Sequence, residues 1–450
     1  MTADLYTLSA TDAARAIASG RLSSEALVRS CWKRIEAVEP KVRAWVCLDQ
    51  AHALDQARTV DRLVRDGKPL RRLPGIPIGV KDVFNSLVFP TQMGSPIWSG
   101  FKAGNDARTV SVLRLEGAVI PGKTVTSEFA VHWPGPTRNP HNLDHSPGTS
   151  SSGSVAAVAA GMVPAALCTQ TAGSTIRPAS FCGMYGMKPS FGMVPRTGML
   201  KTTDTLDHVG FCARALDDVA LLLDVLRVRG LDYPVVHERV REPDSSGRPW
   251  RVAVVKGPFW SGTEDYAREA LASLAAAMER AGMKVEEREP PDEFAQAHAV
   301  HADIYDSCLA YYFQKESRQK PQQISRKFRE MVERGRQVTP AQYDAALERQ
   351  TQLSRSLDHW FEDCDVILTL ASNGEAPKGE EGREQFDTCL IWTLCGVPVV
   401  TAPVFTGPRG LPFGAQLVAR KYDDLKLLRF ARDLQEAGLI PAAAAVAEVQ

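Results

Sequence analysis

The spacing of apolar residues divides the chain into a helical first part and a longer part in which strands and helices alternate. In the first part, apolar positions recur every three or four residues, which is typical of amphipathic helices. The expected helices cover Asp12–Ser19 with Thr11 as its cap, Ser23 to just before Pro40, and Ala51–Arg65, with a strand over Ala44–Leu48.

From Gly75 onward, short apolar runs alternate with helical patterns. The expected strands are Ile76–Val80, Ala118–Ile120, Arg251–Val255, Lys284–Glu289, Asp365–Leu370, Val397–Val404 and Ala415–Val418. The expected helices are Ala107–Glu116, Asp217–Val225, Glu264–Ala281 and Asp423–Glu436. The polar stretch Arg229–Pro249 is expected to be a surface connection, and Glu293 to Asp363 to be mostly helical, charged and peripheral.

This alternation predicts an α/β fold, with a twisted mixed β-sheet covered by helices on both faces. A chain of 450 residues can bury the core that such a fold needs. We expect one large domain over residues 1–450. Within it, 1–74 form a helical part, 75–225 a core with the candidate chemistry, and 250–440 the remaining strands and peripheral helices.

Composition and charge limit the kinds of molecule that this chain is expected to bind. The 53 basic and 53 acidic residues cancel, and the few aromatic residues are not interleaved with basic clusters, so neither nucleic acid nor a membrane is expected as a partner. No secretory signal and no long apolar span are apparent. The nine cysteines include no C-x-x-C pair, which favours a reducing environment. Together these features predict a cytoplasmic protein.

The stretch Pro147–Pro178 has the most informative pattern, because two hydroxyl-rich loops bracket an Ala-rich helix and an apolar strand. The first loop, Gly148–Ser154, opens a helix and offers backbone N–H groups, as a phosphate loop does. No lysine precedes Ser154, however, so the Walker pattern is absent. Taken alone, this loop favours a Ser-rich turn that caps the helix.

Other nucleophile and metal patterns are weak. No serine lies in a Gly-x-Ser-x-Gly elbow. A Ser–His pair stays open, although each nearby histidine is more typical of a loop or surface position; these are His132, His141, His145 and His208. There is neither a His-Glu-x-x-His motif nor a cysteine pair, so we expect no metal and no cofactor.

Lys81 stands at the end of the apolar run Ile76–Val80. Burial disfavours the charged form of a lysine and lowers its pKa, which allows it to act as a base near neutral pH. The alternative is a lysine that reaches the surface and pairs with Asp82 or Glu128. The pattern alone leaves both interpretations open.

Taken together, Lys81, the Ser-rich loop and Gly173-Ser174 resemble the amidase signature family. The central stretch of that family reads Gly-Gly-Ser-Ser-Gly-Gly-Ser, an Ala-rich helix, and then Asp-Thr-Gly-Gly-Ser. The matching segments here are Gly148–Ser154 and Gln170–Ser174. The separation between Ser150 and Ser174 is the usual one in that family. The resemblance extends over most of the chain, from about Ser23 to Glu436.

The resemblance implies a Ser–cis-Ser–Lys triad. In it, Ser174 is the nucleophile, Ser150 is the bridging serine with a cis peptide bond to Thr149, and Lys81 is the base. The oxyanion hole that it implies consists of the backbone N–H groups of Thr171, Ala172, Gly173 and Ser174. The expected activity is hydrolysis of a small non-peptide carboxylic amide to the acid and ammonia or an amine, through a covalent acyl-enzyme.

Some positions depart from the family pattern. Thr149, Ser152 and Ala172 replace glycines, and Gln170 replaces an aspartate. Arg177 follows Ser174 by three positions, where many family members have an arginine two positions after the nucleophile. Arg177 is therefore expected either to bind a substrate carboxylate or to hold the loop through an internal pair.

Two other functions stay open. The same triad would serve one chain of an amidotransferase that works with partner chains on aminoacyl-tRNA, and a non-catalytic binding protein could share the fold. For the main hypothesis the partner is a small-molecule amide, and a homodimer is one option for assembly. The substrate pocket is expected to include the stretch His301–Phe313 and the loop near Trp392.

Overall fold

The computed structural model describes residues 4–131, 133–229, 247–257, 260–379 and 387–449. His132 and most of the expected connection Arg229–Pro249 lie outside these residues.

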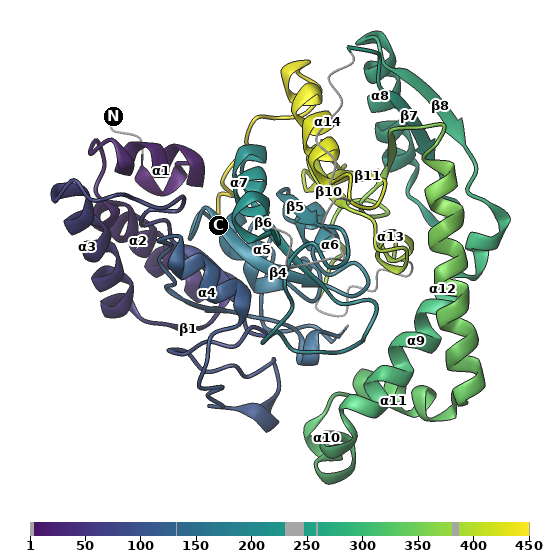
Figure 1. Cartoon of the computed structure of the whole chain (residues 1–450), viewed down its shortest axis with the longest axis horizontal. Helices are drawn as coiled ribbons and strands as arrows, with labels where there is room; N and C mark the ends of the chain where they lie inside the picture. The colour runs from purple at the N-terminus through teal and green to yellow at the C-terminus, as the bar shows by residue number, and fades with distance from the viewer. Residues whose placement is uncertain (1–3, 132, 230–246, 258–259, 380–386, 450) are drawn as a thin grey trace.

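The described strands form one sheet that extends across the molecule (Figure 1). They are β1 (Trp45–Leu48), β2 (Ile78–Lys81), β3 (Gly122–Thr124), β4 (Ala165–Gln170), β5 (Tyr185–Lys188), β6 (His208–Ala213), β7 (Arg251–Val255), β8 (Lys284–Arg288), β9 (Val366–Leu370), β10 (Val399–Thr406) and β11 (Pro412–Ala419). Their order is β1-β3-β2-β4-β6-β5-β10-β11-β9-β7-β8. The sheet is mixed: β3, β2 and β4 are parallel neighbours, as are β8, β7 and β9, whereas the other pairs are antiparallel.

The α-helices lie between and around these strands. They are α1 (Ala10–Ala18), α2 (Ser24–Val42), α3 (Gln50–Arg65), α4 (Arg108–Leu115), α5 (Ser152–Ala159), α6 (Ile176–Phe181), α7 (Leu216–Leu226), α8 (Asp265–Arg280), α9 (Ala297–Tyr312), α10 (Gln314–Gln319), α11 (Arg326–Gln337), α12 (Pro340–Trp360), α13 (Leu390–Leu394) and α14 (Asp424–Glu436). None of the helices in the described ranges has both the length and the hydropathy of a membrane span.

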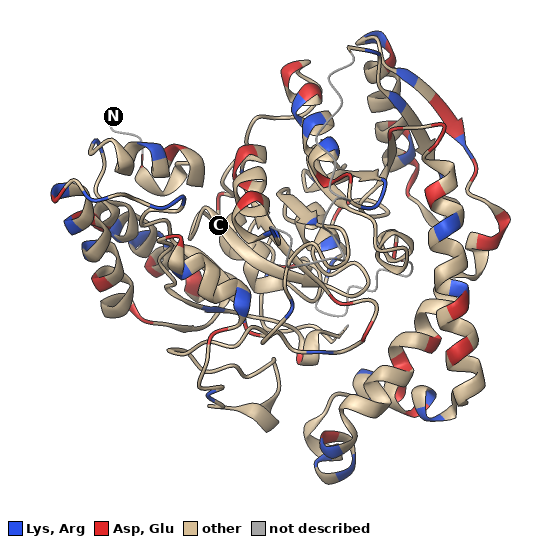
Figure 2. Ribbon diagram, in the orientation of Figure 1, with Lys and Arg blue, Asp and Glu red and all other residues tan. Residues whose placement is uncertain are grey.

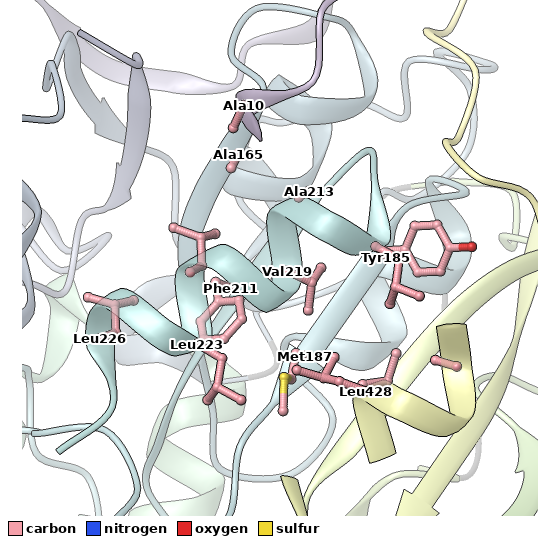
Figure 3. Packing of buried hydrophobic residues seen from close by; sticks show 14 of the residues in the cluster. Ala10, Ala165, Tyr185, Met187, Phe211, Ala213, Val219, Leu223, Leu226 and Leu428 are labelled. Carbon is pink, nitrogen blue, oxygen red and sulfur yellow. The ribbon is translucent and has the colours of Figure 1, made fainter. Parts of the chain in front are cut away.

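Alternate residues of each strand pack on opposite faces of the sheet, as the two-residue period of a β-strand requires. On one face, a single apolar cluster includes side chains from most strands and from α4, α7, α8 and α14. Figure 3 shows part of it, with Phe211 of β6 and Met187 of β5 close to Val219 and Leu223 of α7 and to Leu428 of α14.

The other face is covered by two further clusters. Ala166 and Cys168 of β4 pack with α5, while Ile367 of β9 and Val399 of β10 pack with α9, α11, α12 and α13. Helices thus cover both faces of one mixed sheet, which confirms the predicted fold class.

The stretch from Glu293 to Asp363 is helical, as expected, but only partly peripheral. Figure 2 shows basic and acidic residues interspersed along the ribbons of α11 and α12. In contrast, α9 buries His301, Ile304 and Leu309 and packs against α13. The prediction of a peripheral segment is therefore wrong for α9, because its apolar side chains complete the cluster on the second face of the sheet.

Two helix ends differ from the prediction. Ser9 caps α1 by accepting from the N–H of Asp12, and the N–H of Thr11 instead donates to the Asp218 carboxylate, so Thr11 lies inside the helix. The helix α2 continues through Pro40 to Val42. Pro40 has no N–H to donate to the carbonyl oxygen of Glu36, and the helix ends two residues later, at Val42.

The strand expected over Ala118–Ile120 is also displaced. Only Val119 in that run forms a bridge, to Pro77, and the paired strand is β3 at Gly122–Thr124. A Cβ on Gly122 would lie 2.0 Å from the carbonyl oxygen of Cys47, so glycine at this position allows β1 to approach. The apolar pattern predicted a strand over Ala118–Ile120. The close contact between the backbones at Gly122 and Cys47 instead determines which residues pair with β1.

A buried ion pair connects β2 and β3 on the side opposite Lys81. The Nζ atom of Lys123 lies 3.0 Å from Oδ1 of Asp82, and neither side chain is exposed. Lys123 also donates to the carbonyl oxygen of Phe84 and to the hydroxyl of Thr91. Asp82 therefore pairs with Lys123 and not with Lys81, which excludes one of the two partners considered for Lys81.

Removal of this cation is expected to destabilise the protein. In a Lys123→Met variant the Asp82 carboxylate stays buried without its partner, so the free energy of unfolding should fall by about 3–5 kcal/mol. The denaturation midpoint in urea measures the loss. An Asp82→Asn/Lys123→Met double variant should recover part of it, and a double variant less stable than Lys123→Met would contradict this account.

Candidate active site

The candidate residues meet at one edge of the sheet. Because β3, β2 and β4 are parallel neighbours, their carboxyl ends lie side by side. Lys81 is the last residue of β2, and the loop that begins at Thr171 follows β4 directly. Ile78 and Val80 of β2 point into the large apolar cluster, so Lys81 points toward the face that carries α5.

The amine of Lys81 is fully buried and surrounded by hydroxyl groups. Its Nζ atom lies 2.7 Å from Oγ of Ser150, 3.0 Å from Oγ of Ser151 and 2.7 Å from Oγ1 of Thr169. Within the described part of the chain, none of its hydrogen-bond partners is a carboxylate. Burial without a counter-ion lowers the pKa of Lys81 to about 7. The alternative of a surface lysine is therefore wrong.

The loop before α5 places Ser150 against this amine. The peptide bond between Thr149 and Ser150 is cis, as the family resemblance implied. Gly148 has a φ of +82°, and a Cβ there would lie 2.9 Å from Cα of Pro178, so this position requires glycine. The first loop thus packs directly on α6, the helix that follows the second loop.

The loop after β4 contains Ser174 and is joined to the first loop by a backbone hydrogen bond. The N–H of Ser151 donates to the carbonyl oxygen of Ser174 over 3.3 Å. Gln170 caps α6, because its Oε1 accepts from the N–H groups of Thr175 and Ile176 at 2.9 and 3.0 Å. An uncharged amide therefore makes these two hydrogen bonds in place of the aspartate that the family has at this position.

Four successive N–H groups of this loop make no hydrogen bond to another described residue; they belong to Thr171, Ala172, Gly173 and Ser174. All four residues are buried. Ala172 does not have a positive φ, so its Cβ fits the loop without strain. An arrangement of unpaired donors in a buried loop is suited to an anionic oxygen.

Two side chains that the sequence did not single out hold this loop. Nε2 of His301 in α9 donates to the carbonyl oxygen of Thr171 over 2.8 Å, and burial lowers the pKa of His301 to about 4, so the ring is neutral. Asp207 accepts from the Thr171 hydroxyl at 2.8 Å and from the N–H groups of Thr202 and Thr203. His301 begins the stretch that was expected to shape the pocket, and nothing in the local pattern marked Asp207.

Arg177 joins the two loops to a distant segment. Its Nη1 lies 2.8 Å from Oδ2 of Asp387, and its Nη2 donates to the carbonyl oxygen of Thr149 over 3.0 Å. A Cβ on Gly173 would lie 2.6 Å from Oδ1 of Asp387, so the carboxylate packs directly on the loop that contains Ser174. Of the two roles left open for Arg177, these contacts favour the internal pair.

Of the histidines considered as bases, the described ones form no hydrogen bond with the two candidate serines. His141 donates through Nε2 to the carbonyl oxygen of Cys182, and His208 donates through Nδ1 to that of Leu206. Neither these two rings nor that of His145 is hydrogen-bonded to Ser150 or Ser174 in the described structure. The described ranges also contain no cluster of His, Cys, Asp and Glu that could hold a metal ion.

Comparison with known proteins finds matches along nearly the whole chain. The family model named Amidase matches residues 26–428. A glutamyl-tRNA(Gln) amidotransferase chain of Koribacter versatilis is 31% identical over 468 residues, which cover 95% of this chain and 98% of the relative.

Two solved structures extend the comparison to the fold. A structure described as an amidase is 27% identical, with a TM-score of 0.86 over 95% of this chain and 99% of the other. A glutamyl-tRNA(Gln) amidotransferase chain of Thermotoga maritima is 25% identical, with a TM-score of 0.81 over 100% of this chain and 99% of the other.

The lowered pKa of Lys81 predicts a specific pH dependence of stability. Between about pH 7 and 10.5 the unfolded chain binds a proton at Lys81 that the folded chain does not, so stability rises with pH in this window. From pH 7 to 9, wild type should gain about 2–3 kcal/mol relative to Lys81→Met. Urea denaturation of both proteins at each pH measures the difference, and a difference independent of pH would contradict the lowered pKa.

Proposed function

The chain belongs to the amidase signature family, and from that premise we propose that it hydrolyses a small carboxylic amide to the acid and ammonia or an amine. The observation that carries the proposal is the contact of 2.7 Å between the buried amine of Lys81 and Oγ of Ser150. A lysine whose pKa is about 7 is largely neutral at slightly alkaline pH and can accept a proton.

The hydrogen bonds of Lys81 suit this direction of proton transfer. The hydroxyl of Ser151 donates to the carbonyl oxygen of Thr169, so Ser151 accepts from the amine. A neutral amine has two N–H groups and one lone pair. With hydrogen bonds donated to Ser151 and Thr169, its lone pair is left to accept the proton of Ser150.

In the proposed reaction, Ser174 is the nucleophile. Its Oγ attacks the amide carbon while its proton passes to Oγ of Ser150, and the proton of Ser150 passes to Lys81. The N–H groups of the loop from Thr171 to Ser174 stabilise the negative charge that develops on the carbonyl oxygen, by roughly 3 kcal/mol for each donor. Protonated Lys81 then returns a proton through Ser150 to the leaving nitrogen, and water hydrolyses the acyl-enzyme by the reverse path.

The contacts of Arg177 bear on the class of substrate. Its guanidinium donates to Asp387 and to the carbonyl oxygen of Thr149. An acidic substrate that used Arg177 would have to displace the Asp387 carboxylate, which packs on Gly173. We therefore propose a neutral amide and assign Arg177 the role of holding the two loops together.

One chain of an amidotransferase is the second candidate. It is supported by the 31% identity to a glutamyl-tRNA(Gln) amidotransferase chain along nearly the whole of both proteins. The neutral charge that argued against nucleic acid gives no basis for excluding this function. Copurification of a partner chain, together with glutamine-dependent amidation of aminoacyl-tRNA, would favour it over free amide hydrolysis.

Substitution of the three proposed catalytic residues tests the mechanism. We expect Ser174→Ala and Lys81→Ala to lower kcat/KM by about 10³-fold or more on a panel of aliphatic, aryl and dicarboxylic monoamides, because each removes a step of the proton relay. Ser150→Ala should have a comparable effect. A fluorophosphonate probe should label Ser174 in wild type and not in Ser174→Ala.

Two outcomes would reject this mechanism. Full activity of Ser174→Ala would exclude Ser174 as the nucleophile. A folded wild-type protein that hydrolyses none of these amides, supports no transamidation and is not labelled by the probe would favour a binding protein without catalysis.

The pH profile tests the role of Lys81 separately. Because the base must be neutral, the rate of fluorophosphonate labelling should fall about tenfold per pH unit below pH 7 and level off above it. Lys188 supplies a matched control, because burial also lowers its pKa to about 7 while its amine donates to the carbonyl oxygen of Val397, outside the triad. A Lys188→Met variant that lost the inflection would assign the titration to Lys188 and contradict the proposal.

A further inference from the structure

A cavity of about 270 Å³ lies beside the loop that leads into α5. Its walls come from parts of residues 134–138 and 143–149, from Ser152, and from residues 378–379. Lys81, Ser150 and Ser174 do not line it. The loop from Thr149 to Ser152 thus contributes both to the wall of the cavity and to the proposed catalytic site. No residue of the proposed triad lines the cavity.

Two buried polar side chains of this cavity have no hydrogen-bond partner among the described residues. His145 is 7% exposed, and neither of its ring nitrogens is paired. Ser152 is 2% exposed, and its hydroxyl is also unpaired. Buried polar groups are seldom left unsatisfied, since this costs about 1–3 kcal/mol each. Two such groups on the wall of one cavity are available as hydrogen-bonding groups for a polar ligand.

The charges around the cavity favour an anion. Of the described residues that line it, Arg138 and Lys378 are basic and Asp144 is acidic, with its Oδ2 3.8 Å from Nζ of Lys378. The helix α5 begins at Ser152, so the positive end of its dipole faces this loop. In the described structure, the backbone N–H groups of Thr149 and Ser152 donate to no acceptor.

We propose that this cavity binds a small oxyanion of the carboxylate or phosphate class. The hydroxyl of Ser152, an imidazole N–H of His145 and the N–H groups at the start of α5 are its hydrogen-bond donors, and Arg138 and Lys378 supply positive charge. Ser152 replaces a glycine of the family pattern, so this hydroxyl is a feature of the present chain.

The position of the cavity implies coupling to the catalytic loop. Thr149 and Ser152 flank Ser150 and Ser151, and the hydroxyls of those two serines contact Lys81. An oxyanion that orders Thr149 and Ser152 therefore also orders the serines between them. Binding at this site does not depend on the proposed amidase activity, so the two proposals fail independently.

Isothermal titration calorimetry of the full chain tests the site. Succinate, acetate and inorganic phosphate are titrated separately at constant ionic strength, with chloride as the balancing anion. We expect one saturable site for at least one of these probes, and the order of affinity distinguishes a carboxylate from a phosphate ligand. The absence of saturable binding by all three would overturn the proposal.

Substitution of residues that line the cavity tests where the anion binds. The dissociation constant should rise about tenfold in His145→Ala and about fivefold in Ser152→Gly, because each loses one hydrogen bond. Lys378→Ala, at an exposed position that is not expected to affect folding, should also weaken binding, whereas His359→Ala on the exposed side of α12 should not. Binding that is equally tight in all four variants would place the ligand elsewhere and overturn the proposal.

Discussion

A lysine amine buried without a counter-ion is the constraint on which the candidate site depends. Among the described residues, three lysines are fully buried, and each is stabilised in a different way. Lys123 pairs with the Asp82 carboxylate, Lys188 donates to a backbone carbonyl, and Lys81 contacts hydroxyl groups. Hydroxyl groups stabilise an ammonium ion less than a carboxylate does, so the pKa of Lys81 falls toward neutrality. These hydroxyls belong to the first loop and to β4, the strand that precedes the second loop.

The fold meets this constraint by placing segments from different parts of the chain at one edge of the sheet. Parallel pairing of β2 with β4 brings Lys81 next to the strand that precedes the loop containing Ser174, and α5 returns the chain from Ser150 to β4. Close approach of Gly148 to Pro178 then holds the first loop against α6. Strand pairing and close packing between the loop and helix backbones therefore hold Lys81 and the two hydroxyl-rich loops in position.

The sequence predicted most helices and strands, because these depend on the local spacing of apolar residues. It also predicted the contact between Lys81 and Ser150, because the family resemblance covers both residues. Most strands and helices lie where their periodicity placed them, and Lys81 meets Ser150 as the family resemblance implied. His301, Asp207 and Asp387 were missed as supports of the loop that contains Ser174, because each acts through contacts with residues far away in the sequence. The displaced strand at β3 has a related cause, since its pairing depends on close backbone approach at Gly122.

The ion pair between Arg177 and Asp387 has a consequence for biosynthesis. It joins residues 210 positions apart, and the contact between His301 and Thr171 spans 130 positions. Contacts of such high sequence separation form late, because a long loop must close before they are made. A nascent chain thus contains Lys81, Ser150 and Ser174 well before the residues that brace the loop around Ser174 have been synthesised. The proposed catalytic residues can therefore be held in this arrangement only after the chain has been synthesised beyond Asp387.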